Sequence, residues 1–337
     1  MAVKNQKITD QYAIYCGDCI EVMDKLPKES IHFSMYSLPF FTDEKGLYSY
    51  SSDERDLSNC ANKEQFMEQY EYVVRRIHDV TMPGRLSAVH CTTLPAGNSG
   101  GDYIVDFPGE IIRLHEKCGW KLKAEHYIWK EPLGVRNRTK AKDLNHCTTV
   151  DDCAEAGVAS ADQLLIFVRG GKNKIPIAHP NGFTEYFGIN EITKDKLKYR
   201  GWKGNQIYNT YSQKVWQYYA SSHWFDIDID DVLPYKESRD SEDEKHVHPL
   251  QLTVYKRAIV MRSNPGEVVL EPFMGVGSGI YAAVQLGRHG VGIELKNSYF
   301  RQAVKNLESI KMKADNFNGD LFAELDEKEF DEIHEQI

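Results

Sequence analysis

The sequence predicts a doubly wound α/β fold, in which helices cover both faces of a largely parallel sheet. Residues 268–294 read as a strand, a glycine-rich turn, a helix and a second strand that ends in an acid. That order is typical of the mononucleotide-binding half of such a fold. Short apolar runs also alternate with amphipathic segments before residue 170. A length of 337 residues allows one large domain of this kind or two modest ones.

The first half of the chain supplies strands and helices in alternation. Residues 10–26 predict a strand, a Gly-Asp turn and a helix. Apolar residues at helical spacing predict further helices over 63–80 and 104–118. The remaining apolar runs predict strands at 30–37, 86–91, 122–130 and 163–169, with a turn at 82–85. The polar stretches 42–62 and 131–161 predict loops.

The second half divides into an irregular and a regular part. Residues 170–245 are rich in Lys, Gly, Asn, Tyr and Trp and show little periodicity. Regular patterning then returns and predicts helices at 249–263, 278–287 and 297–310, with strands at 267–270 and 290–294. Residues 311–337 form an acidic end.

Composition excludes several protein classes. Hydrophobic residues are 41% and charged residues 27% of the chain, as in ordinary globular proteins. No apolar run approaches the roughly 18 residues of a membrane span. The first residues lack a signal-peptide core, so we expect a cytoplasmic protein with no membrane partner. The seven scattered cysteines are expected to be reduced. Membrane, collagen-like, disulfide-rich and wholly disordered classes are therefore excluded.

The net charge of −9 argues at first against a nucleic-acid partner, but its distribution does not. Residues 311–337 carry nine acids and three bases, a net −6. Residues 121–142 carry a net +5 and residues 169–217 a net +6. A local basic patch is what a phosphate backbone meets, so a nucleic acid remains a candidate partner.

The glycine-rich turn favours a particular kind of ligand. Gly275 and Gly277 allow the backbone to turn tightly at the helix start, and Glu294 can accept hydrogen bonds from ribose hydroxyls. The dinucleotide fingerprint fails, because Ile280 stands where it needs glycine. Glu271 would repel a pyrophosphate but would suit an amino group. The turn therefore favours a nucleoside with a positively charged amine over NAD.

A second motif lies at the end of the strand predicted at 30–37, where the chain reads Ser37-Leu38-Pro39-Phe40. Proline stiffens the turn and withholds an N–H, which leaves nearby carbonyls pointing out of the sheet edge. Such carbonyls and a side-chain oxygen can accept both hydrogens of an aromatic amino group, while a ring stacks on the base. By itself this segment could equally be an ordinary turn.

Together the two motifs resemble those of the S-adenosylmethionine-dependent DNA amino-methyltransferases. Residues 37–40 resemble the (D/N/S)-P-P-(Y/F/W) loop of that family, and residues 271–279 (EPFMGVGSG) resemble its D-P-F-x-G-x-G-T turn. Gly17-Asp18-Cys19 and His248-Pro249-Leu250-Gln251 resemble its GD and H-P-x-Q segments. The order, with the catalytic loop first, is similar to the circularly permuted β group. The resemblance covers roughly 10–130, 160–170 and 246–310.

The resemblance implies a Rossmann-like methyltransferase sheet, S-adenosylmethionine as cofactor and double-stranded DNA as partner, with a possible homodimer. It divides the chain into 1–169 and 246–310 as the catalytic domain and 170–245 as a target-recognition insert. It implies that Ser37 and the Leu38 carbonyl bind the target amine, that Pro39 fixes the loop, and that Phe40 stacks on a flipped base. The implied cofactor residues are Asp18, His248, Glu271, Phe273, Gly275, Gly277, Ser278 and Glu294. The implied DNA-binding residues are Arg200, Trp202, Lys203 and Lys214.

The chain departs from the family pattern at three of these positions. Leu38 replaces the first proline, Glu271 replaces an aspartate and Ser278 replaces a threonine. A serine at the first loop position favours cytosine N4 over adenine N6 in this family. The alternatives are an RNA or protein-amide methyltransferase and a DNA-binding protein whose loop has decayed at Leu38. We expect no metal site, because Cys16 and Cys19 lack a second pair and the acids at 226–231 follow a strand-like alternation.

Overall fold

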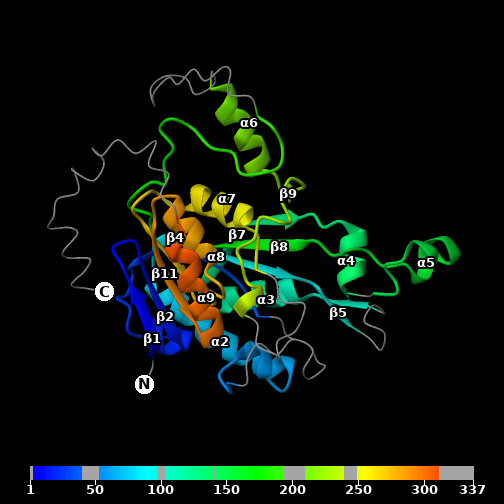
Figure 1. The fold of residues 1–337 in the computed structure, drawn as a ribbon, viewed down its shortest axis with the longest axis horizontal. Helices are drawn as coiled ribbons and strands as arrows, with labels where there is room; N and C mark the ends of the chain where they lie inside the picture. The colour runs from blue at the N-terminus through cyan, green and yellow to red at the C-terminus, as the bar shows by residue number, and fades with distance from the viewer. Residues whose placement is uncertain are drawn as a thin grey trace.

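The computed structural model describes residues 3–39, 53–96, 103–139, 141–192, 209–238 and 249–310. In this part of the chain, nine strands form one mixed sheet in the order β1-β2-β11-β10-β3-β4-β8-β7-β9. Helices cover both faces of the sheet (Figure 1). The predicted α/β fold class is therefore confirmed. None of the helices in the described ranges is long and apolar enough to cross a membrane.

The strands and helices have the following bounds. The main sheet contains β1 (Val3–Ile8), β2 (Tyr12–Gly17), β3 (Ile31–Ser37), β4 (Thr81–Thr92), β7 (Trp120–Ile128), β8 (Asp162–Arg169), β9 (His223–Trp224), β10 (Val268–Glu271) and β11 (His289–Glu294). A separate hairpin pairs β5 (Leu94–Ala96) with β6 (Tyr103–Val105). The helices are α1 (Cys19–Met23), α2 (Lys63–Val80), α3 (Phe107–Lys117), α4 (Pro132–Thr139), α5 (His146–Asp151), α6 (Thr210–Tyr219), α7 (Leu252–Arg262), α8 (Ser278–Gln285) and α9 (Asn297–Glu308). Short 3-10 turns lie at Leu57–Asn59, Cys153–Glu155 and Lys236–Ser238.

The direction of the strands positions the two sequence motifs. Strands β2, β11, β10, β3 and β4 are parallel to their neighbours in this series. Strand β8 is antiparallel to β4 and to β7, so β7 points the same way as β4. The carboxyl ends of β3 and β10 therefore meet at one edge of the sheet. Ligands of open α/β sheets bind at such an edge.

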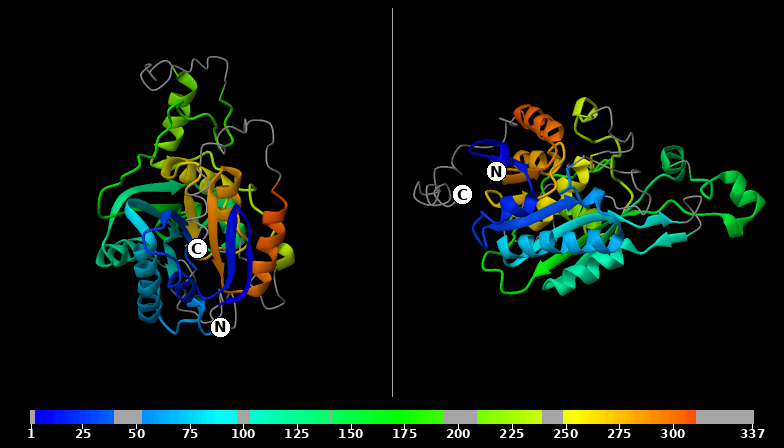
Figure 2. Two further views of the ribbon diagram at one scale, coloured as in Figure 1. Left: turned by 90° about the vertical axis from the view of Figure 1, so that its left-hand side faces the viewer. Right: turned by 90° about the horizontal axis from the view of Figure 1, so that it is seen from below.

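The core has one layer on each face of the sheet. On one face, α2 and α3 bury Phe66, Tyr70 and Ile111 against Leu165 and Phe167 of β8. On the other face, α7 and α8 pack against β3, β8 and β10, and α9 packs on β2 and α8. Figure 2 shows the blue-to-cyan helix α2 and the orange helix α9 on opposite sides of the sheet.

Helix ends follow the capping residues in the sequence. Asn62 accepts a hydrogen bond from the Gln65 N–H, 2.8 Å away, at the start of α2. Asp106 likewise accepts from the Gly109 N–H and fixes the start of α3. The helix predicted over 104–118 was therefore placed too early, since residues 103–105 form β6 instead.

The structure differs from the expected elements at a loop, in the insert, at a turn and at one edge strand. The predicted loop 131–161 contains the short helices α4 and α5, and the irregular insert contains the ten-residue helix α6. The turn expected at 82–85 lies within β4, where Gly84 takes a φ of +75°. The edge strand β1, which pairs antiparallel with β2, was not predicted because four of its six residues are charged or amide-bearing and its side chains are mostly exposed.

Candidate active site

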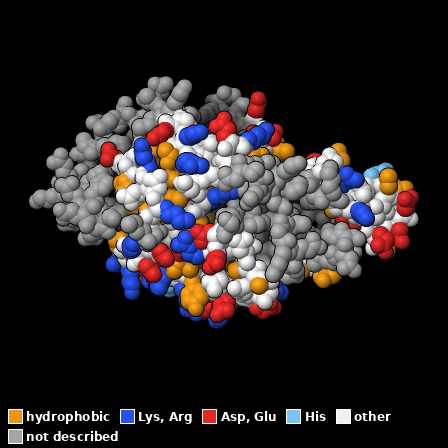
Figure 3. Space-filling view, turned by 60° about the horizontal axis from the view of Figure 1, so that its bottom comes forward, with side chains coloured by type: hydrophobic (Ala, Val, Ile, Leu, Met, Phe, Trp, Pro, Cys, Tyr) orange, Lys and Arg blue, Asp and Glu red, His pale blue; other side chains and the backbone are white. Residues whose placement is uncertain are grey.

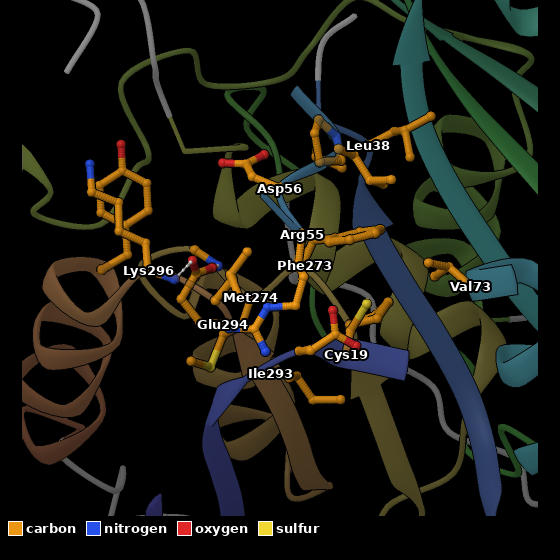
Figure 4. A pocket seen from close by; sticks show the side chains of 18 of the residues that line it. Cys19, Leu38, Arg55, Asp56, Val73, Phe273, Met274, Ile293, Glu294 and Lys296 are labelled. Carbon is orange, nitrogen blue, oxygen red and sulfur yellow. Dashed lines mark hydrogen bonds between the residues drawn. The ribbon is translucent and has the colours of Figure 1, made fainter. Parts of the chain in front are cut away.

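A cavity of about 530 Å³ lies at the carboxyl edge of the sheet. Its wall takes residues from the segments that follow β2, β3, β10 and β11. These segments include Asp18 and Cys19, the loop residues 37–39, the turn residues 272–276, and Glu294 with Lys296. Figure 4 shows Leu38, Phe273 and Glu294 around this space. The fold thus brings the two sequence motifs to a single cavity.

The glycine-rich turn uses left-handed backbone at two positions. Gly275 has a φ of +56° and Gly277, directly before α8, has a φ of +89°. Residues other than glycine rarely adopt these backbone angles. A Cβ at Gly277 would also stand 3.2 Å from the Cβ of Ala303 on α9, which is closer than ordinary packing. A Cβ at Gly275 would meet nothing within 4 Å, so the backbone angle alone accounts for glycine there.

Glu271 lies behind the cavity and is absent from its lining. Its side chain is buried and accepts hydrogen bonds from the Tyr255 hydroxyl and from the N–H groups of Gly279 and Ile280, at 3.0 and 3.2 Å. Burial raises the pKa of Glu271 to about 8. The carboxyl group therefore fixes the start of α8, and the structure does not place it beside a ligand amine. Gly277 also lies outside the lining.

Glu294 faces the cavity at the end of β11. Its carboxylate accepts hydrogen bonds from the N–H groups of Gly275 and Lys296, each at 2.8 Å. Burial raises the pKa of Glu294 to about 7. A carboxylate has about four acceptor positions, so two remain for a ligand hydroxyl pair. The Lys296 ammonium lies 4.7 Å from the centre of the Tyr299 ring, at the same wall.

Two further predicted cofactor residues differ in how their polar atoms are used. Ser278 lines the cavity with a buried hydroxyl that has no hydrogen-bond partner within the described part of the chain. Asp18 lines the cavity too, but its carboxylate caps α1 by accepting from the N–H groups of Ile20 and Glu21, at 2.9 and 3.0 Å. A buried hydroxyl without a partner is unusual, so Ser278 marks a place where a polar ligand atom fits.

The composition of the cavity wall suits a cationic ligand with an apolar part. Phe273, Met274 and Ile293 supply apolar surface. The charged lining residues are the acids Asp18, Glu21, Glu54, Asp56 and Glu294 and the bases Arg55 and Lys296. The segment 53–59 supplies several of these groups, although the sequence predicted only a loop there. Its polar, aperiodic residues carried no signal of a site.

Residues 37–39, predicted to be the catalytic loop, continue the pairing of β3 with β4. The Ser37 hydroxyl lies 3.1 Å from Nδ1 of His90, and the Leu38 N–H donates to the His90 carbonyl at 3.2 Å. Leu38 and Pro39 both line the cavity, and the Leu38 side chain is also packed into the core. A proline at position 38 could not donate that hydrogen bond. Phe40 lies outside the described residues.

Of the predicted DNA-binding residues, the structure describes Lys214, which does not line the cavity. Lys214 lies on α6, with its ammonium 5.4 Å from the centre of the Tyr218 ring. Helix α6 rises away from the sheet in Figure 1. Arg200, Trp202 and Lys203 lie outside the described residues, as does His248. On the face shown in Figure 3, the described Lys and Arg side chains are intermixed with Asp and Glu.

A buried ion pair ties the described part of the insert to the core. The Arg257 guanidinium on α7 binds Asp226 with two hydrogen bonds of 2.9 and 2.6 Å. Its centre also lies 5.2 Å from the ring centres of Tyr219 and Trp224. Asp226 is thus engaged by an arginine. Within the described ranges, no three His, Cys, Asp or Glu side chains gather as a metal site would require.

The model of the DNA methylase family matches residues 31–305 of the chain. Among curated relatives, the type II methyltransferase M.BamHI of Bacillus amyloliquefaciens is 23% identical over 92% of this chain and 60% of its own length. M.HpaI of Haemophilus parainfluenzae is 27% identical over 50% of this chain and 42% of its own length. The chain thus spans about half the length of these two relatives. M.MjaI of Methanocaldococcus jannaschii is 22% identical over 91% of this chain and 94% of its own length.

Two solved structures share the fold at low sequence identity. The cytosine-N4-specific PvuII DNA methyltransferase superposes with a TM-score of 0.58 and 13% identity, over 99% of this chain and 95% of that one. A putative DNA modification methylase of Thermus thermophilus, in complex with S-adenosyl-L-methionine, superposes with a TM-score of 0.56 and 17% identity, over 87% and 92%. The sheet and its helices are therefore those of a known architecture.

Proposed function

The chain belongs to the DNA methylase family of N6 and N4 methyltransferases, and from this premise we propose that it methylates an exocyclic amine of a DNA base. The methyl donor in this proposal is S-adenosylmethionine. One observation carries the proposal, namely that the loop at 37–39 and the turn at 272–276 line the same cavity. Because they share one cavity, an amine and a methyl donor bound to these two segments would lie close together.

The cavity residues fit the proposed cofactor. Glu294 has acceptor positions for ribose hydroxyls, Ser278 has a hydroxyl for a polar atom, and Phe273 offers an apolar face for a flat base. The acids of the wall favour a cation. Bound S-adenosylmethionine would supply a methyl group activated by a sulfonium. For Glu271 we propose a positioning role, because its carboxyl group holds the start of α8.

The loop residues fit the proposed target. The Ser37 oxygen and the Leu38 carbonyl would accept the two hydrogens of the amine and so direct its lone pair away from the loop. Pro39 would hold this geometry, and Phe40 would stack on the base. The base has to leave the duplex to reach a cavity of this kind, at a cost of a few kcal/mol. Holding both reactants in line lowers the barrier by up to about 7–11 kcal/mol.

We propose cytosine N4 as the methylated atom, with adenine N6 as the alternative. The support is Ser37, because a serine at the first loop position favours cytosine in the resemblance described above. We further propose that residues 170–245 recognise the target, through Arg200, Trp202, Lys203 and Lys214. The possible homodimer stays a prediction, which sedimentation of the full chain tests.

The experiment that tests the proposed substrate offers three polymers in parallel. The full chain is incubated with S-adenosylmethionine labelled in its methyl group and with unmethylated DNA, RNA or protein. We expect label in DNA alone. Label in RNA or protein would replace the proposed substrate. Cofactor binding without transfer to any polymer would favour the alternative of a decayed catalytic loop.

A further inference from the structure

Four polar side chains form a row that begins at the catalytic loop and crosses the carboxyl edge of the sheet. Ser37, His90, Asp162 and Lys130 lie at or next to the ends of the adjacent strands β3, β4, β8 and β7. Successive members are 3.1, 3.2 and 2.5 Å apart, measured between Oγ and Nδ1, Nε2 and Oδ2, and Oδ1 and Nζ.

Strand register accounts for the row. Ser37 is the pairing partner of His90 across β3 and β4, and Asp162 is the partner of Ile128 across β8 and β7. Lys130 lies two residues beyond the end of β7, and its ammonium reaches Oδ1 of Asp162. Strand register therefore places Ser37, His90 and Asp162, and Lys130 joins them from the segment after β7. Only Ser37 belongs to a motif that the sequence revealed.

Asp162 is charged and lies inside the protein. Both His90 and Asp162 are buried, with 7% of each residue exposed. Burial by itself would raise the pKa of the Asp162 carboxyl. The nearby Lys130 and His90 outweigh burial and hold that pKa well below its usual range. A buried carboxylate with a lysine on one oxygen and an imidazole on the other is therefore a fixed negative charge.

The carboxylate decides which nitrogen of His90 carries the proton. Oδ2 of Asp162 can only accept, so it favours a proton on Nε2. Nε2 of His90 and Oδ2 of Asp162 are 3.2 Å apart without the geometry of a hydrogen bond. The negative charge of Asp162 therefore acts on the ring mainly by electrostatic attraction of the Nε2 proton. In the neutral ring, Nδ1 then carries no proton and can accept from the Ser37 hydroxyl, 3.1 Å away. The lone pairs of the Ser37 oxygen are left facing the cavity.

We infer that His90 is a positioning residue that keeps the Ser37 hydroxyl as a hydrogen-bond acceptor toward the target amine, with Asp162 selecting its tautomer. This inference rests on the proposed function. A hydroxyl can donate or accept, and a donating Ser37 would compete for the amine lone pair that has to attack the methyl group. The row removes that ambiguity, because the hydroxyl proton is committed to Nδ1.

The test changes the tautomer of His90 by a substitution that keeps the shape of the Asp162 side chain. In Asp162→Asn, the amide has the shape of the carboxylate but no negative charge. The Lys130 ammonium holds the amide oxygen, so the NH2 group faces Nε2 and disfavours a proton there. The ring proton then moves to Nδ1 and turns Ser37 into a donor. We expect the single-turnover rate of methyl transfer to fall by about 10²-fold, as when one preorganised hydrogen bond is removed from an active site. The affinity for S-adenosylmethionine should not change. Lys130→Met keeps the Asp162 carboxylate and should have a smaller effect.

A spectroscopic measurement separates this role from a merely structural one. Nitrogen-15 shifts of histidine-labelled protein report the tautomer, and His90→Leu identifies the signal of His90. We expect the proton on Nε2 in the wild type and on Nδ1 in Asp162→Asn. A proton on Nδ1 in the wild type, or a full rate in Asp162→Asn, would overturn the role of His90.

His115→Leu is the matched control for removing a buried imidazole. His115 lies on the other face of the sheet, stacked on Phe167 with ring centres 4.0 Å apart. We expect this variant to lose stability but to keep the wild-type rate, while His90→Leu loses the rate. If the wild type itself transfers no methyl group to DNA, the proposed function is wrong, and the role of His90 that rests on it is wrong too. An active wild type with the wrong tautomer overturns the role of His90 alone.

Discussion

The two halves of the carboxyl edge of the sheet differ in which groups hold their geometry, backbone N–H groups in one and side chains in the other. In the half proposed to bind the cofactor, backbone N–H groups carry the geometry, since those of Gly275, Gly279 and Lys296 bind the carboxyl groups at the ends of β10 and β11. In the half proposed to bind the target, side chains at the ends of four strands carry it, through the row that starts at Ser37. We call these the cofactor half and the target half. A site made from backbone needs only a short segment of suitable residues. A site made from side chains depends on the register of the whole sheet.

The largest effect is expected for Ser37→Ala. It removes the hydroxyl at the start of the target half and leaves every backbone contact of the cofactor half in place. We expect the single-turnover rate of methyl transfer to fall by about 10²–10³-fold. Isothermal titration should give an unchanged affinity for S-adenosylmethionine. A lost affinity instead would show that the two halves are not separate.

The next largest effect is expected for Leu38→Pro, which restores the family residue. It removes the hydrogen bond from the Leu38 N–H to the His90 carbonyl and part of a buried side chain. We expect a loss of about 2 kcal/mol in the free energy of unfolding. Denaturant titration measures this loss. A more stable or faster variant would mean that loop rigidity, and not pairing with β4, governs the target half.

Gly277→Ala tests the cofactor half through its backbone. We expect a loss of about 1–2 kcal/mol from the left-handed angle alone, increased by the contact with Ala303. Gly266→Ala is the matched control, because Gly266 has a φ of +78° and a Cβ there would meet nothing within 4 Å. Thermal unfolding compares the two variants. Equal losses would show that the approach of α9 does not constrain the turn.

The smallest expected effect is a pH dependence at Glu294. Its pKa of about 7 means that the side chain is protonated on the acid side of neutrality. A bound cation favours the ionised form, so affinity for S-adenosylmethionine should fall as the pH is lowered below 7, by at most tenfold per unit. Glu294→Gln should bind more weakly and lose this dependence. If the variant keeps the same slope, another group is responsible.

The sequence revealed the cofactor half because its parts lie within one short segment. Residues 271–279 and Glu294 span a strand, a turn, a helix and a strand, and each step has a local signature. The same reasoning could not tell which way Glu271 points. An acid at a strand end can face the cavity or the following helix, and here three donors hold it toward α8.

The target half was predictable only at its first residue. Ser37 ends an apolar strand and precedes a proline, which is a local signal. His90, Asp162 and Lys130 have no common spacing, because they meet through the strand order β3-β4-β8-β7. Sequence periodicity gives the elements of a sheet but not their order across it. The helices α4 and α5 were missed for a different reason, because both are short and neither has a clear apolar face to give a periodic pattern.

The identity of the methylated atom tests the proposed function and the role of Ser37 together. Unmethylated DNA is incubated with the full chain and labelled S-adenosylmethionine, digested to nucleosides and analysed by mass spectrometry. We expect N4-methylcytosine. N6-methyladenine would keep the mechanism and change the base that Ser37 accepts. DNA with no methylated exocyclic amine, from a chain shown to bind the cofactor, would contradict the central claim that the cavity joins a methyl donor to a base.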